Sequence, residues 1–278
     1  MILYEIKNKS EMKNIKNTGY IISVFGVSSS PLNISIDYAE EIIKSSLNPV
    51  YLKLNLLYHD KDYPKLIEVL DNLKGLKGII FQDLGLVELN KNYNLDLIYD
   101  PGTFNTVVED VSYFKNTSIE ALIISREISL SEIKDFVSQD KNMLYGYHVY
   151  GKPLMFYSLR KHFTSFRNVE KDFPNLKGKY DVFLKEETRN EFYPTYEDEN
   201  GFFIFRDETI NVYEYLDIFK NVDYLILDRP FIGDEEYFDT LDLYLGNIDY
   251  KEYKNKYPSQ TLGYFFKEMG VKLKKWKE

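Results

Sequence analysis

The stretch Val50-Tyr-Leu-Lys-Leu-Asn-Leu-Leu57, followed by Tyr63–Leu73 and then by Gly78-Ile-Ile-Phe-Gln82, decides the fold of this chain. The first and last pieces are short, apolar and rich in residues that favour β-strands. Apolar residues of the middle piece recur at helical spacing, and its Pro64 suits the first turn of a helix. A strand, a helix and a second strand in this order form a βαβ unit with two parallel strands.

The same alternation runs along most of the chain. Its 278 residues are close to the roughly 250 of a (β/α)8 barrel. The sequence therefore predicts an α/β fold, a TIM-like (β/α)8 barrel that forms one domain over residues 1–278. The eight predicted strands are Ile2–Ile6, Tyr20–Val27, Val50–Leu57, Gly78–Gln82, Leu95–Asp100, Ala121–Ser125, Met143–Val149 and Val222–Leu227. The predicted helices are Ser10–Ile15, Ile36–Ser46, Tyr63–Leu73, Phe104–Phe114, Ser131–Val137, Asp234–Leu245 and Thr261–Lys272.

The regular alternation breaks after the seventh strand. Residues 151–221 hold a predicted helix at Tyr157–Arg167 and a predicted β-ribbon that pairs Asp181–Glu187 with Gly201–Arg206. The Asn-Gly pair that ends at Gly201 is a strong turn signal. We expect an insertion at 151–221, between strands seven and eight of the barrel.

The composition restricts the chemistry. The sequence has no cysteine, which excludes disulfides, thiolate zinc sites, cysteine nucleophiles and cysteine-ligated iron–sulfur clusters. With three histidines we expect no histidine metal triad. The net charge of −9 argues against a surface coated with Lys and Arg for nucleic acid, although Lys272–Glu278 is locally basic. No apolar run of about 18 residues occurs, so we expect a cytoplasmic protein without a membrane span.

Functional groups of a parallel barrel gather where strands run into the following loops. Asp83 is a candidate base, or it caps the next short helix. Arg126 beside Glu127 offers a guanidinium fork for a carboxylate or phosphate, or it forms a structural ion pair. His148 is either an acid–base group or a hydrogen-bonded structural histidine. The candidate catalytic residues are Asp83, Glu127 and His148, and the candidate substrate-binding residues are Asn55, Gln82, Arg126, Tyr157, Arg160 and Arg189.

Four segments, in this order and spacing, resemble the peptidase U32 family of collagenase-like peptidases. They are Phe81–Gly85, Ser125–Ile133, Gly151–Lys161 and Lys185–Pro194, and the position of Asn55 also fits. The resemblance covers most of the chain, and Ser125–Ile133 is its most distinctive part. It implies the same barrel that the strand pattern predicts.

The family's hallmark pattern is missing. Where it has Glu, two cysteines and Ser around the position of Gly151, this chain has Gly146, Leu154, Lys161 and Thr164. The chain therefore resembles the shorter, cysteine-free members of the family. We expect no cofactor, because the iron–sulfur cluster of other members is held by four cysteines.

The resemblance implies a role in tRNA modification, the conversion of a tRNA uridine to 5-hydroxyuridine. Its partners would then be tRNA and a paralogous U32 subunit. Two alternatives remain at this point. The family name implies a protease, although position suggests no Ser–His pair, aspartic dyad or metal site. The missing cysteines also fit a non-catalytic assembly partner of a cysteine-containing paralogue.

Overall fold

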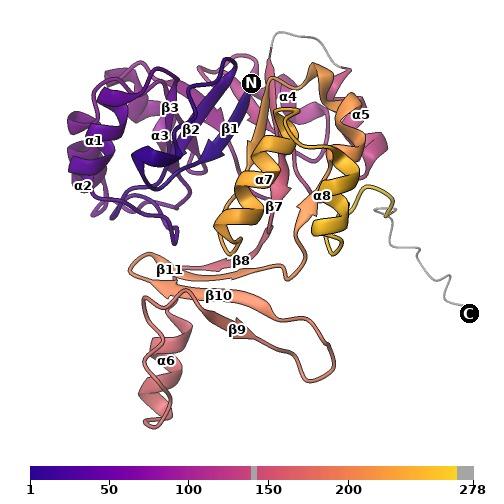
Figure 1. Ribbon diagram of the computed structural model, residues 1–278. Coiled ribbons are helices and arrows are strands. Elements are labelled where there is room, and N and C mark those ends of the chain that lie inside the picture. Colours follow the sequence, from indigo (N-terminus) through magenta and orange to yellow (C-terminus); the bar gives the residue numbers. More distant parts are fainter. Residues whose placement is uncertain (139–142, 268–278) are drawn as a thin grey trace, which may run out of the picture.

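In a computed structural model that describes residues 1–138 and 143–267, eight parallel strands close into a barrel (Figure 1). The eighth, β13, closes the ring by pairing with β1, with Leu3 opposite Ile226. The TIM-like barrel is thus confirmed, and each of the eight predicted runs supplies one of its strands. The barrel strands are β1 (Ile2–Glu5), β2 (Thr18–Ile22), β3 (Val50–Leu54), β4 (Gly78–Phe81), β5 (Asp96–Tyr99), β6 (Ala121–Ile123), β7 (Leu144–Gly151) and β13 (Tyr224–Leu227).

Helices pack around the outside of this barrel (Figure 1). The predicted helix at Phe104–Phe114 begins only at Glu109, and that at Ser10–Ile15 is reduced to a 3-10 turn. The described part of Thr261–Lys272 is not helical, while its end and the basic Lys272–Glu278 lie outside the described residues. The helices of the barrel are η1 (Lys9–Glu11), α1 (Ile36–Ser45), α2 (Tyr63–Asn72), α3 (Gly85–Leu89), η2 (Asn90–Asn92), α4 (Glu109–Phe114), α5 (Leu130–Val137), η3 (Tyr213–Asn221), α7 (Asp234–Tyr244) and α8 (Tyr250–Lys256).

Two apolar layers alternate along the strands. Tyr4 and Leu52 belong to the large layer between the strands and the helices, whereas their neighbours Leu3 and Tyr51 belong to a smaller layer inside the barrel. This alternation follows from the two-residue period of a strand. The interior layer consists of Leu3, Ile21, Tyr51, Ile80, Ile98, Ala121, Ile123, Tyr224 and Ile226. Because it fills the barrel, a ligand can enter only at one of the two ends.

The insertion between β7 and β13 is a four-stranded antiparallel sheet, which lies below the barrel in Figure 1. The insertion expected from the sequence is confirmed, but its ribbon has another pairing. The segment expected to connect the ribbon strands is itself a strand, β10, which lies between the two predicted partners. The strands, in sheet order, are β8 (Leu154–Ser158), β11 (Gly201–Phe205), β10 (Tyr193–Asp198) and β9 (Val182–Leu184), while β12 (Ile210–Asn211) pairs with β7.

The predicted helix at Tyr157–Arg167 was wrong in its first turn. Tyr157 lies in β8, where it pairs with Phe203 and stacks on that ring at 4.7 Å. The helix α6 (His162–Val169) starts later because Glu197 accepts hydrogen bonds from the backbone N–H groups of Phe163, at 2.7 Å, and Thr164, at 3.2 Å. A partner strand and a buried carboxylate, neither visible in local spacing, thus set the boundary.

Gly151, at the end of β7, allows the close approach of β13. Its φ is +127°, and a Cβ there would lie 2.6 Å from the Cβ of Asp228. We expect Gly151→Ala to lower the free energy of unfolding by about 3 kcal/mol, from backbone strain plus a steric clash. Gly178→Ala is the control, because Gly178 also has a positive φ, +75°, but open space around it. Urea unfolding measures the free energy of unfolding of both variants. Equal losses would show that the close approach to Asp228 does not contribute to the destabilisation.

Candidate functional site

A layer of polar side chains closes the carboxyl end of the barrel. Seven of its eight members lie two residues after an apolar residue of the interior layer, and His148 lies four residues after Leu144, which packs against that layer. Strand periodicity therefore points these side chains inward as well. Lys53 thus follows Tyr51 on β3, and Asp228 follows Ile226 after β13. The layer comprises Glu5, Ser23, Lys53, Gln82, Asp100, Ser125, His148 and Asp228.

Asp228 is the centre of a buried ionic network. Its Oδ2 lies 3.1 Å from Nη1 of Arg126 and 2.7 Å from Nδ1 of His148, and its Oδ1 lies 3.4 Å from Nζ of Lys53. The side chain of Asp228 is only 7% exposed. The Nδ1 contact is within ion-pair distance, but its direction does not meet hydrogen-bond geometry.

Two further carboxylates complete the network. Asp100 Oδ2 lies 2.9 Å from Nε2 of His148, on the other side of the ring. Glu5 accepts a hydrogen bond from Nζ of Lys53 at 2.6 Å and another from the backbone N–H of Arg229 at 2.8 Å. With a protonated imidazole, three cations therefore face three carboxylates, and the buried charge is balanced.

The pKa values follow from this balance. Burial by itself lowers the pKa of His148, but the carboxylates of Asp228 and Asp100 outweigh it and raise the pKa above its ordinary value. Burial alone would raise the pKa of Asp228, but His148, Lys53 and Arg126 hold it far below the usual range. Asp228 therefore stays ionised, while His148 retains its proton to a higher pH than a free histidine.

A pocket of about 320 Å³ lies between this polar layer and the insertion sheet. Arg126, His148 and Asp228 form part of its floor, and side chains of the insertion form the opposite wall. Tyr157 and Phe203 are stacked within that wall, with ring planes 13° apart. The wall consists of Pro153, Leu154, Met155, Phe156, Tyr157, Phe203 and Phe205. The pocket thus offers an aromatic face above a set of charged donors and acceptors, and we call it the mouth pocket.

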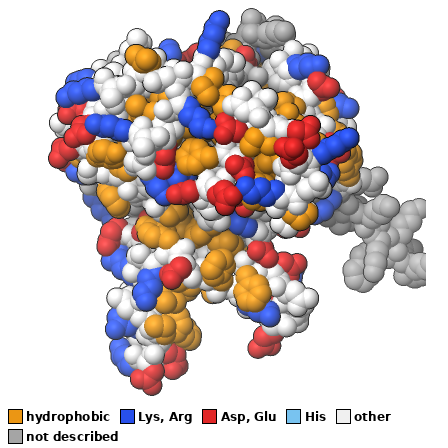
Figure 2. All heavy atoms as spheres, viewed as in Figure 1, with side chains coloured by type: hydrophobic (Ala, Val, Ile, Leu, Met, Phe, Trp, Pro, Cys, Tyr) orange, Lys and Arg blue, Asp and Glu red, His pale blue; other side chains and the backbone are white. Residues whose placement is uncertain are grey.

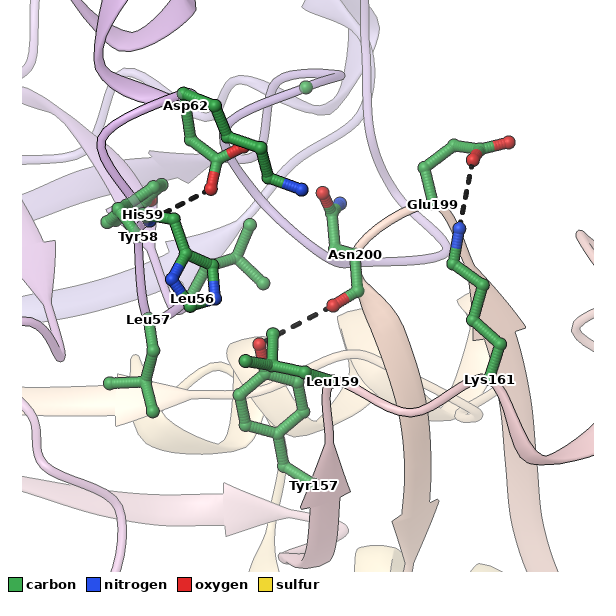
Figure 3. A pocket seen from close by; sticks show the side chains of 12 residues that line it. Leu56, Leu57, Tyr58, His59, Asp62, Tyr157, Leu159, Lys161, Glu199 and Asn200 are labelled. Atoms are coloured by element: carbon green, nitrogen blue, oxygen red, sulfur yellow. Dashed lines mark hydrogen bonds and ion pairs between the residues drawn. The ribbon is translucent and has the colours of Figure 1, made fainter.

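A second, smaller pocket of about 180 Å³ adjoins the mouth pocket, and Tyr157 lines both. In Figure 3, residues of the insertion face the loop that follows β3 across this space. Lys161 and Glu199 are paired at its edge at 3.4 Å, and the Asn200 carbonyl accepts a hydrogen bond from the Tyr157 hydroxyl. The loop side is formed by Leu56, Leu57, Tyr58, His59, Lys61 and Asp62.

Six of the nine predicted site residues line the mouth pocket, namely Asn55, Gln82, Arg126, Glu127, His148 and Tyr157. The other three do not. Both carboxylate oxygens of Asp83 accept backbone hydrogen bonds, one from Tyr58 and one from Gly85, the first residue of α3. Arg160 is exposed beyond β8, and Arg189 is exposed and paired with Glu186 at 3.1 Å. Whether the six contact a substrate stays a prediction.

Sequence reasoning missed Glu5 and Lys53, and it did not select Asp100 or Asp228 from the polar residues at the strand ends. A usable signal was present. Glu5 and Lys53 each stand two residues after an apolar residue of their strand, so the period of two already predicts that they share its interior face.

Within 1–138 and 143–267, no group of three or more His, Asp or Glu side chains is arranged to hold a metal ion. Across the same ranges, no helix has both the length and the apolar character needed to span a bilayer.

The fold and site define a barrel protein with a pocket at the carboxyl ends of its strands, between the barrel and an inserted sheet. Residues 29–269 match the model of peptidase family U32, which confirms the resemblance seen in the sequence, and the chain belongs to that family. It is also similar to the tRNA hydroxylation protein P2 of Bacillus subtilis (strain 168). The two are 22% identical over 220 residues, which cover 76% of this chain and 71% of that protein.

The raised pKa of His148 leads to a pH-dependent contribution to stability. A charged group with a raised pKa stabilises the folded state fully below its unfolded pKa, about 6.5, and this contribution is lost as the pH rises through the folded pKa. We therefore expect the wild type to have a higher free energy of unfolding than His148→Gln. The difference should be largest at pH ~5.5 and should shrink progressively above pH ~6.5. Urea unfolding across this range measures the difference, with His59→Gln as a control. A difference that grows with pH would contradict the assignment.

Proposed function

We propose that this chain binds a tRNA uridine in the mouth pocket and takes part in its conversion to 5-hydroxyuridine. The observation that carries the proposal is the aromatic wall above a charged floor. An enzyme that modifies a base takes it out of the stack, places it between aromatic or apolar side chains and reads its edge with hydrogen bonds. The similarity to a tRNA hydroxylation protein supports the same reading.

The floor suits the edge of a uracil ring, which presents two carbonyl oxygens and one N–H group. Arg126 and Lys53 are donors that line the pocket, and Arg126 uses one nitrogen on Asp228, which leaves other N–H groups for a ligand. Gln82 and Glu127 supply acceptors for an N–H group. Tyr157 in the wall offers a ring against which a base can stack.

Hydroxylation at C5 replaces a C–H bond by a C–O bond and removes two electrons from the uridine. We assign to this chain the binding and orientation of the base. The chain has no cysteine to hold an iron–sulfur cluster, so we propose that a paralogous, cysteine-containing U32 subunit supplies the oxidising partner. The peptidase alternative has less support, because His148 is held between two carboxylates and Asp228 is paired with three cations, so neither is free to activate a nucleophile.

Deletion of the gene tests the proposal. We expect 5-hydroxyuridine in tRNA to fall at least severalfold and to return when the wild-type gene is supplied, as measured by mass spectrometry of tRNA nucleosides. Complementation with an Arg189→Gln gene is expected to restore it equally, because Arg189 lies outside the pocket. Unchanged 5-hydroxyuridine after deletion would reject the proposed function.

A further inference from the structure

A basic projection lies beside the proposed uridine pocket. Residues 160–179 contain six Lys or Arg and two Asp or Glu, in a chain whose net charge is −9. They include α6 and the loop after it, which extend away from the barrel (Figure 1). We call this segment the α6 arm. In Figure 2 its Lys and Arg side chains line one edge of the projection.

Most of these cations are free for a partner. Lys161 and Lys177 share Glu199, at 3.4 and 2.6 Å. The other four, which are Arg160, Arg167, Lys171 and Lys179, are exposed and form no ion pair within the described part of the chain. Although Glu170 and Asp172 lie among them, the six cations leave residues 160–179 with a net charge of +4 (six minus two), which favours a polyanionic partner.

The arm is held firmly at its base. Glu197 is fully buried, and its carboxylate accepts backbone hydrogen bonds from the first turn of α6, from Phe163 at 2.7 Å and Thr164 at 3.2 Å. Phe163 packs edge-on against Phe202 of the insertion sheet at 4.9 Å between ring centroids. Beyond this base, Phe166 and Val169 are 52% and 77% exposed, so the arm presents apolar as well as basic surface. It is a fixed projection with no described partner along its length.

The arm begins directly beside the mouth pocket. Tyr157 lines that pocket, and Arg160 follows three residues later, at most about 10 Å along the chain. Lys161, the next residue, lines the smaller pocket together with Tyr157 (Figure 3). An RNA strand that leaves the mouth pocket past Tyr157 therefore meets a run of cations.

We propose that the α6 arm binds the phosphate backbone of the RNA whose uridine occupies the mouth pocket. The inference rests on the proposed function for the identity of the RNA, and it resolves how an acidic protein holds a polyanion. Phosphate contacts from Lys and Arg supply most of the affinity for a nucleic acid, whereas contacts to the base supply specificity. The pocket and the arm thus divide these two tasks.

The test is tRNA binding by the full chain across a range of salt concentrations. The arm variant combines Arg160→Ala, Arg167→Ala and Lys171→Ala. The control combines Lys44→Ala, Lys65→Ala and Lys91→Ala, which remove the same charge from exposed helix pairs of the barrel. At 0.1 M salt we expect the arm variant to bind bulk tRNA at least about tenfold more weakly than the wild type, with a slope of log K against log salt smaller by about 2 to 3. The control should stay within about twofold of the wild type.

Equal affinities of the arm and control variants would overturn the inference, as would a wild-type chain that binds no tRNA. Loss of a protein partner with unchanged tRNA binding would also overturn it, since the arm would then be a protein interface. The proposed function fails separately. If deletion leaves 5-hydroxyuridine unchanged while the arm variant loses tRNA affinity, only the function is rejected. If deletion removes the modification but the arm variant binds normally, only the arm is rejected.

Discussion

Asp228→Asn is expected to lower the free energy of unfolding by about 3 to 5 kcal/mol, the range seen when one partner of a buried ion pair is removed. Asp228 contacts Lys53, Arg126 and His148, so its loss leaves three cations facing two carboxylates in a closed site. In this variant Lys53 still pairs with Glu5, and His148 still pairs with Asp100. Arg126, however, has no ion-pair partner left within the described residues. Urea unfolding at pH ~7 measures the loss.

The matched control is Asp217→Asn. Asp217 is also an ion-paired aspartate, but its side chain is 88% exposed and its partner Lys220 lies three residues away. We expect a change within about 0.5 kcal/mol there. If the free energy of unfolding fell by the same small amount in both variants, the network around Asp228 would not be a buried ionic network in solution.

Arg126→Gln is expected to reduce 5-hydroxyuridine about tenfold or more in a deletion strain that carries the variant gene. Arg126 lines the mouth pocket and has N–H groups beyond the one on Asp228, and a hydrogen bond to a charged group is worth roughly 1.5–3 kcal/mol. Asp228 still pairs with Lys53 and His148 in this variant, so we expect the chain to remain folded.

Arg189→Gln serves as the matched control for this change. Both residues were expected from the sequence to bind substrate, but Arg189 is exposed, pairs with Glu186 and does not line the pocket. We expect its nucleoside profile to equal that of the wild type. If 5-hydroxyuridine fell in Arg189→Gln but not in Arg126→Gln, the uridine would bind outside the barrel mouth.

The sequence allowed the barrel to be predicted because its strands are short, apolar and regularly spaced. Val50–Leu57 and Gly78–Gln82 both formed strands near their expected positions, with Tyr63–Leu73 as a helix between them. Local pattern is a strong signal there, since burial on both faces of a parallel strand demands apolar residues. The single-domain organisation over 1–278 stays a prediction.

The insertion was harder to predict because its pairing is set by contacts between distant segments. Tyr157 fits a helix by local spacing, yet it pairs with Phe203, and Glu197 fixes the start of α6 from another strand. The strand propensity of such a segment depends on the strand it pairs with, and single-sequence spacing does not identify that partner.

The candidate site was predictable in part. Arg126 was found because polar residues that follow apolar strands in a barrel gather at one end, and His148 was found because it is a titratable residue near the end of an alternating strand. Glu5 and Lys53 were missed because each stands within its apolar run rather than after it, and only closure of the barrel through β1 and β13 brings Glu5 near Asp228. Asp83 accepts a hydrogen bond from the backbone N–H of Gly85 and does not line the mouth pocket, and its role as a base stays a prediction.

Whether the mouth pocket holds the uridine that becomes modified is tested by a photo-crosslink from tRNA that carries 4-thiouridine at the target position. The attached peptide is identified by mass spectrometry. We predict attachment to the insertion wall, in peptides that contain Phe156 and Tyr157 or Phe203, and its disappearance when unmodified tRNA is added in excess. Attachment confined to residues that do not line the mouth pocket would show that the uridine binds elsewhere.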